Sequence, residues 1–319
     1  MSETFKNEFT FSNVGFSHSD SEALVFSQWK WNPGIYLSYR MLTAGYALFA
    51  FIYTFLKVKN PQHNLMTYLT IWSFLILTIY LVMSVFVTSY HIYMTSRGRS
   101  RSVCKKSVLP KAAYSVLNGI STGLSNTGFT DKSNAGDVVK DVNEKIAPTP
   151  YGTNNQNDVE SATSSLSVKS EVTWYMIMTW IFADIVYVFA LIVTVVYFGA
   201  LNPSIGRTSY GDVNVHGVNS VLVLIDAFVV ARPVRLLHAL YPALYGLCYV
   251  VFNTVYWTFD KDNNVLYPYV LDWNHPGITS AFIVGLTLVG IPFFQLMHFG
   301  IYKMRLYIYK RIYGSEVPG

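Results

Sequence analysis

The sequence predicts an all-α protein, a six-helix transmembrane bundle with a long disordered cytoplasmic loop. The number of helices follows from counting about 20 apolar residues for each spanning helix. Two observations lead to this fold class. Hydrophobic residues make up 52% of the 319 residues and charged residues only 13%, which is too apolar for an ordinary water-soluble domain. Apolar runs near spanning length also recur along the chain, interrupted by one long polar stretch.

The first two spanning helices are expected at Ile35 to Leu56 and Leu65 to Tyr90, runs rich in Leu, Ile, Phe and Tyr. The later runs are Trp174 to Leu201, His216 to Val230, Leu237 to Phe259 and Ile278 to Met304. The run from His216 is short and contains Asp226, but a carboxylate that is paired or faces a cavity is tolerated within a bundle. Pro292 removes a backbone hydrogen bond and predicts a kink in the last helix.

The polar stretch from Ser96 to Ser170 is rich in Ser, Asn, Gly, Thr and Lys, has few aromatic residues and shows no periodicity. Such a composition is typical of disorder. The predicted organisation is therefore a cytoplasmic N-terminal tail at 1–34, helices 1 and 2 within 35–94, the disordered cytoplasmic loop at 95–172, helices 3 to 6 within 173–308, and a cytoplasmic C-terminal tail at 309–319. The N-terminus has no basic start followed by an apolar core, so no cleavable signal peptide is expected.

Basic residues cluster after the second, fourth and sixth predicted helices. They are Arg97, Arg99, Arg101, Lys105 and Lys106, then Arg232 and Arg235, then Lys303, Arg305, Lys310 and Arg311. The positive-inside rule places all three helix ends, and therefore both termini, in the cytoplasm. The membrane is expected to be the plasma membrane or an endomembrane. Because these residues adjoin apolar runs and form no separate basic face, the lipid bilayer is the expected partner and nucleic acid is not.

The two cysteines, Cys104 and Cys248, do not make a disulfide framework. Cys104 lies in a basic stretch beside a predicted helix, where S-palmitoylation would add a lipid anchor. Gln295 and His298 are three residues apart on one helix face, a spacing compatible with proton or metal handling. A metal site needs further ligands, and the sequence has no zinc-ligand spacing or phosphate-binding glycine loop, so no metal and no cofactor are expected.

Ionisable residues within the predicted helices form the candidate intramembrane polar site. His216, Asn219 and Asp226 share roughly one helix face. They form either a midmembrane site in which Asp226 orients a partner, or a stripe that joins helices, with Asp226 neutralising Arg40 or Arg232. Asp184 also needs a partner, and Arg40 is a candidate. A proton or small-molecule transporter would use Asp184, Asp226 and His298, but no internal repeat is visible.

Several long stretches resemble one family in order and spacing. They are SQWKWNPGIYLSYRMLTAGYALF, MTYLTIWSFLILTIY, VHGVNSVLVLIDAFVVARPVRLLHALYPALYGLCYVVFNTVYW and VLYPYVLDW. Together they resemble the Rolling stone family of multi-pass membrane proteins across nearly the whole chain, except the polar loop. The resemblance implies a six-helix membrane protein, and the founding insect member of the family is associated with myoblast fusion in muscle development.

The chain is also distantly similar to the androgen-induced protein family, which comprises membrane hydrolases of fatty acid esters of hydroxy fatty acids. That resemblance places Thr43 at the position of the nucleophile. The family reads His-Gly-Met-His where this chain reads His216-Gly217-Val218-Asn219, so its catalytic histidine falls on Asn219. Asparagine cannot accept and return a proton near neutral pH, which leaves His216 as the base that a hydrolase of this chain would need.

The sequence therefore favours a non-enzymatic Rolling stone-like membrane protein that acts through membrane protein partners in a developmental process such as cell fusion. The alternative is a membrane lipid hydrolase with Thr43 as nucleophile and His216 as base. A lipid is a candidate ligand under either hypothesis.

Overall fold

The computed structural model describes residues 8–18, 20–57, 64–108, 172–206 and 208–314, without the side chains of residues 98–108, 204, 205 and 210. The chain divides into two compact units, Met1–Tyr93 with Lys169–Gly319, and Met94–Val168. In the second unit the structure describes only the last turns of one helix, up to Val108. The disorder predicted beyond that point and the side chain of Cys104 lie outside the described residues.

Helices dominate the described residues, which contain two isolated β-bridges and no strand. Five helices there are long and apolar enough to cross a membrane. They are α2 (Pro33–Lys57), α3 (Leu69–Val108), α6 (Trp174–Val196) with η4 (Tyr197–Leu201), η6 (Leu236–Ala239) with α10 (Leu240–Phe259), and the run of α11 (Pro276–Gly285), η7 (Leu286–Gly290) and α12 (Ile291–Tyr313). The prediction of an all-α membrane bundle is confirmed.

A shorter sixth apolar helix is formed by η5 (Val213–Val218) and α9 (Asn219–Val229). At 1.5 Å per residue it is about 25 Å long, slightly shorter than the roughly 30 Å hydrocarbon core of a bilayer. The short elements that complete the first unit are η1 (Phe11–Val14), η2 (Ser21–Leu24), η3 (Leu65–Thr67), α7 (Asn202–Ile205) and α8 (Tyr210–Asp212).

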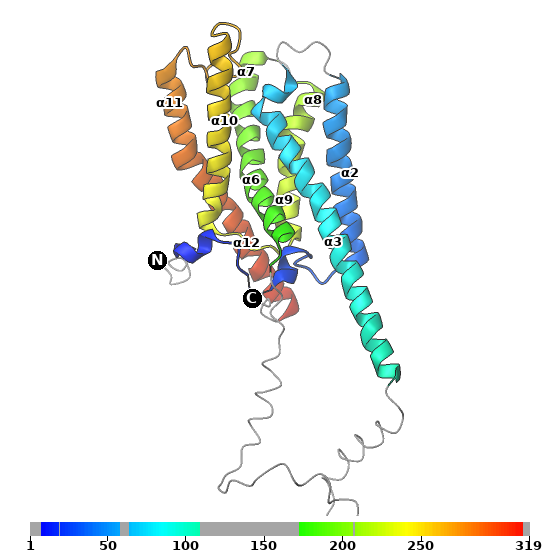
Figure 1. Ribbon diagram of the computed structural model, residues 1–319. Helices are drawn as coiled ribbons and strands as arrows, with labels where there is room; N and C mark the ends of the chain where they lie inside the picture. The colour runs from blue at the N-terminus through cyan, green and yellow to red at the C-terminus, as the bar shows by residue number, and fades with distance from the viewer. Residues whose placement is uncertain (1–7, 19, 58–63, 109–171, 207, 315–319) are drawn as a thin grey trace, which may run out of the picture. The chain divides into compact units, whose positions relative to one another are not determined.

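Helix α6 is the centre of the first unit. In its most apolar window 67% of the residues are buried, against 22% in α10 and 11% in the last helix. It packs against α9, α10 and α12 (Figure 1). The outer helices expose large apolar side chains, such as Leu42 (74%), Phe86 (69%) and Leu288 (69%). Exposure of such side chains to water would be unfavourable. In a bilayer they contact lipid tails, which are as apolar as the side chains are.

The N-terminal segment that was expected to be a tail is folded against the bundle. Ser27 pairs with Val230 in an antiparallel bridge, and the Gln28 amide donates to the Val229 carbonyl at 2.9 Å. The indole of Trp29 donates to the Phe228 carbonyl at 3.1 Å. These bonds satisfy carbonyl groups at the end of α9, where no further helical turn supplies N–H groups to donate to them.

Two helices extend furthest beyond their predicted ends. Helix α3 continues to Val108, into the stretch predicted to be disordered. The polar composition of that stretch gave no sign that a helix beginning in the apolar run would extend into it. Helix α12 continues to Tyr313, into the predicted C-terminal tail. Near the predicted kink lies the π-helical segment η7, which ends two residues before Pro292. A Cβ atom at Gly290 would lie 2.8 Å from Leu286 Cδ1, so a larger residue there would require the Leu286 side chain to shift.

Candidate functional site

Asp226 on α9 is the centre of a buried network of charge and phenols. Arg40 of α2 donates from Nη1 to Oδ1 of Asp226 at 2.6 Å, with both side chains at most 2% exposed. The hydroxyl of Tyr39 donates to the same oxygen at 3.2 Å, and those of Tyr80 and Tyr187 donate to Oδ2. We call this set the Asp226 cluster; its members are Tyr36, Tyr39, Arg40, Tyr80, Tyr187 and Asp226.

The cluster connects four helices. Tyr36, Tyr39 and Arg40 lie on one face of α2, at the spacing of one turn, and the guanidinium donates from Nε to the Tyr36 hydroxyl at 2.8 Å. Tyr80 comes from α3 and Tyr187 from α6. A buried carboxylate is stable only when it is paired and hydrogen-bonded. Both oxygens of Asp226 already accept donors, so the cluster is suited to holding helices together and not to binding a substrate.

Asp184 has a different partner from the one expected. Arg40 was its candidate partner, but Arg40 binds Asp226, and Asp184 instead lies 2.6 Å from Nδ1 of His238. His238 is fully buried, and its ring contacts Phe16 of the N-terminal segment and Trp180 of α6. The expectation was wrong because His238, in the turn before α10, lies beside Asp184 only after the chain has folded.

Two arginines assigned to cytoplasmic loops are buried. Arg305 is 1% exposed and donates from Nη1 to the carbonyls of Ala227 and Val230 and from Nη2 to that of Arg232. Arg232 is 4% exposed and donates to the Tyr80 hydroxyl at 3.0 Å. The guanidinium of Arg305 therefore caps the C-terminal end of α9, where carbonyl groups carry the negative end of the helix dipole.

The other predicted polar residues have backbone carbonyl partners. Gln295 donates to the Arg235 carbonyl at 2.6 Å, and Asn219 donates to the Val215 carbonyl at 2.7 Å. Nδ1 of His298 lies 2.8 Å from the Phe294 carbonyl, and its ring stacks on Tyr187. His298 thus borders the Asp226 cluster. The described residues contain no group of three or more His, Cys, Asp or Glu side chains that would hold a metal ion.

Thr43 and His216 have separate surroundings. The Thr43 hydroxyl lies 3.1 Å from each of the carbonyls of Tyr39 and Arg40, one turn back in its own helix. The imidazole of His216 stacks parallel on the ring of Tyr197, with centroids 3.6 Å apart, and its Nδ1 is buried without a hydrogen-bond partner. Within the described part of the chain no hydrogen bond joins the hydroxyl of Thr43 to the imidazole of His216.

Two cavities adjoin at His216. The first, of about 270 Å³, is lined by apolar side chains of α3, α6, α10, α11 and η7. The second, of about 540 Å³, lies among α2, η4, α8, η5 and the loop before α11 and has a more polar lining. Neither is lined by Thr43. The residues that line both are Thr70, Tyr197, Leu201, His216 and Tyr267.

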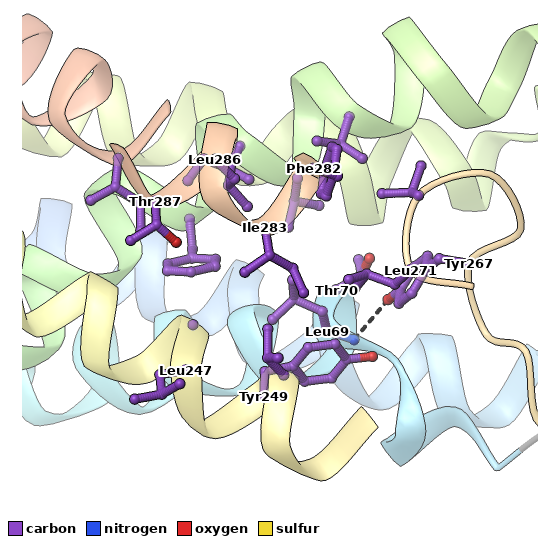
Figure 2. Close-up of a pocket in the computed structure, with 18 of the residues that line it drawn as sticks. Leu69, Thr70, Leu247, Tyr249, Tyr267, Leu271, Phe282, Ile283, Leu286 and Thr287 are labelled. Atoms are coloured by element: carbon purple, nitrogen blue, oxygen red, sulfur yellow. Dashed lines mark hydrogen bonds between the residues drawn. The ribbon is translucent and has the colours of Figure 1, made fainter. Parts of the chain in front are cut away.

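The loop before α11 closes one end of the first cavity. In Figure 2, Tyr267 from this loop lies beside Leu69, whose amide donates to the Tyr267 hydroxyl at 2.8 Å. Ile283 and Leu286 lie on the α11 and η7 side, and Leu247 on the α10 side. Burial raises the pKa of Tyr267 to about 12, so this phenol stays neutral at physiological pH. Tyr267 and Leu271 of this loop are buried.

Sequence reasoning found Asp226 but not most of its partners. The spacing of Tyr36, Tyr39 and Arg40 is a usable signal, because the three lie on one helix face. Tyr80 and Tyr187 gave no signal, since both occur in runs crowded with aromatic residues. His238 and Arg305 were missed because residues next to a predicted membrane boundary are normally solvated.

Comparisons with known proteins give the family. The family model described as "Protein rolling stone" matches residues 152–316, just over half of the chain. A relative named "Protein rolling stone" from Drosophila melanogaster is 31% identical over 145 residues, which are 43% of this chain and 52% of that protein. The match therefore spans about half the length of that relative. No solved structure matches the chain. The family match includes every helix from α6 to α12, and on this ground the chain belongs to the rolling stone family.

Proposed function

We propose that this chain acts without catalysis, through membrane protein partners, in a developmental process such as myoblast fusion. Membership of the rolling stone family supports the developmental role. The observation that carries the non-catalytic part is the position of Thr43, whose hydroxyl lies 3.1 Å from two backbone carbonyls of its own helix.

A catalytic threonine needs a base within about 3 Å, or one water away, to take its proton. The partners recorded for the Thr43 hydroxyl are carbonyl oxygens, which accept a hydrogen bond but cannot take the proton near neutral pH. Asn219, at the position of the related family's histidine, donates to the Val215 carbonyl and has no basic nitrogen. The hydrolase hypothesis would require the ring of His216 to leave Tyr197 and reach Thr43.

The Asp226 cluster supports a role as a rigid scaffold. It joins α2, α3, α6 and α9 through one carboxylate, so these helices are held in a single arrangement. The exposed apolar faces of the outer helices are then available for lateral contacts within the membrane.

Rescue of cell fusion tests this proposal. In fusion-competent cells lacking the endogenous protein, the native chain is expected to restore mixing of cell contents, and Thr43→Ala is expected to restore it equally. The matched control is Ser38→Ala, which removes another α2 hydroxyl bonded to a carbonyl one turn back. Purified native protein should not release fatty acid from esters of hydroxy fatty acids above background.

Loss of rescue by Thr43→Ala, at unchanged membrane abundance and with Ser38→Ala active, would contradict the non-catalytic role. Ester hydrolysis by native protein that Thr43→Ala and His216→Ala both abolish would promote the hydrolase in its place. Failure of the native chain itself to restore fusion would remove the developmental proposal.

The proposed orientation places both termini in the cytoplasm. Fewer basic residues support this orientation than the sequence indicated, because Arg232 and Arg305 are buried and do not act as loop charges. Lys303, Lys310 and Arg311 remain on the last turns of α12.

Epitope tags at residue 2 and residue 319 should resist protease added to intact cells and be cleaved after permeabilisation. A tag inserted after Lys261 should be cleaved in intact cells if the protein is at the cell surface. Cleavage of a terminal tag in intact cells would reverse the orientation.

A further inference from the structure

We infer that the two adjoining cavities form one binding site for a long-chain fatty acid, with the acyl chain in the first cavity and the carboxylate in the second, beside Lys57. The inference does not depend on the developmental role proposed above. It rests on the lining of the two cavities, on an opening toward the bilayer, on one unpaired cation and on the backbone of the segments that build the site.

The first cavity suits an acyl chain. Of the side chains that line it, those from α6 and α10 are almost all aliphatic or aromatic, among them Phe189, Ile192, Val193 and Val250. An apolar cavity of this kind stays dry and accepts an apolar guest. Transfer of each CH₂ group from water into such a site is favourable, so a long chain binds well without specific polar contacts.

The first cavity also opens toward the region that lipid would occupy. Leu244 and Leu247 of α10 line it and are 49% and 58% exposed. Thr287 of η7 lines the same cavity and is exposed as well. In a bilayer these side chains face lipid tails, so an acyl chain can enter between α10 and η7 without crossing water.

The second cavity holds the polar groups. Lys57, in the last turn of α2, lines it together with Asp212 and Asn214. Asp212 accepts from the amide and the hydroxyl of Ser209, both at 2.8 Å, and Asn214 accepts from the Tyr46 hydroxyl. Oδ2 of Asp212 and Oδ1 of Asn214 therefore already accept hydrogen bonds.

Lys57 is different. Its ammonium lies 5.6 Å from the centroid of the Tyr53 ring, and among the described ion pairs it has no carboxylate partner. A lysine at the end of a spanning helix reaches toward the membrane interface, where the carboxylate of a fatty acid lies. The unpaired cation therefore selects an anionic head over a neutral one.

The backbone that lines the two cavities departs from regular α-helix. The described residues contain three π-helical segments, η4, η5 and η7, and each of them contributes residues to the lining. Tyr197 begins η4 and His216 lies within η5, and both line the two cavities. Single π turns within α-helices are frequent at functional sites. Here η4 and η5 widen the turns at the point where chain and head would meet, and η7 widens the wall of the first cavity.

Binding of radiolabelled palmitate to the purified full-length protein in detergent tests the site. Saturable binding is expected, with unlabelled palmitate competing more strongly than hexadecanol, which has the same chain and no charge. Lys57→Gln should weaken palmitate binding by about tenfold, the loss expected for one charge-assisted hydrogen bond, and leave competition by hexadecanol unchanged. The matched control is Lys261→Gln, which removes a lysine that also lies over an aromatic ring, Trp257, but lines neither cavity.

Val250→Phe, which fills the first cavity, should abolish binding of both ligands. Val251→Phe, the same change at the next residue, which is 55% exposed and outside the cavities, should bind as the native protein does. A photoactivatable palmitate analogue supplies a test on the native chain, in case Val250→Phe does not fold: its crosslinks should map to α10 and η7 residues of the first cavity. Absence of saturable palmitate binding, equal binding by Val250→Phe and Val251→Phe, or crosslinks confined to the outer faces would overturn the inference.

Discussion

Replacement of Asp226 by alanine is expected to lower the free energy of unfolding by about 3–5 kcal/mol, the cost of leaving one partner of a buried ion pair unpaired. Arg40 would keep its charge in a position that is 1% exposed, with the Tyr36 hydroxyl as its remaining acceptor at 2.8 Å. The hydroxyls of Tyr80 and Tyr187 would lose their acceptor at the same time. The purified protein should therefore unfold at a clearly lower temperature, or fail to accumulate in the membrane.

The matched control is Asp262→Ala, which removes an exposed carboxylate from the turn after α10 and should change the free energy of unfolding by no more than about 0.5 kcal/mol. A double variant that replaces Arg40 by Met and Asp226 by Leu should lose less stability than the sum of the two single changes, because no unpaired charge remains. Equal unfolding temperatures for Asp226→Ala and Asp262→Ala would show that the cluster does not stabilise the bundle.

Arg305→Leu is expected to have an effect of similar size, on the order of 4 kcal/mol, since each buried acceptor left without a donor costs about 1–3 kcal/mol. The carbonyls of Ala227, Val230 and Arg232 would lose their donor. Unlike the Asp226 change, this one acts between α12 and the end of α9. Faster amide exchange at Val230 and Ala231, measured by mass spectrometry, should accompany the lower unfolding temperature.

Arg311→Leu is the control for this change. Arg311 lies on the same helix, is exposed, and donates to the Tyr307 hydroxyl one turn back, at 3.0 Å, so its loss should be nearly neutral. Arg305→Lys separates charge from geometry: a single ammonium cannot reproduce the fork that spans three carbonyls, and an intermediate loss is expected. Native stability of Arg305→Leu would refute the capping role.

The site was only partly accessible to sequence reasoning, and the reason differs between residues. Asp226 stood out because an ionisable group in an apolar run has to be compensated. Arg305 stood in a basic cluster at a membrane boundary, where the positive-inside rule assigns every cation to a loop, and that rule carries no information on burial. The N-terminal segment has a polar composition that predicts a tail, yet Leu24 and Val25 pack with Val87, Met176 and Trp180.

By itself the sequence determined the membrane class, the approximate helix positions and the family, because apolar runs, helix lengths and the stretches that resemble the family are read locally along the chain. Only the tertiary structure decided which charges pair, where the cavities lie and which polar groups remain open. Arg40 and Asp226 are 186 residues apart, and Arg305 and Ala227 are 78 apart. The physical reason is that a buried charge needs a partner, which can lie anywhere in the bundle. Local periodicity predicts only which face of a helix carries the charge, not the residue that pairs with it.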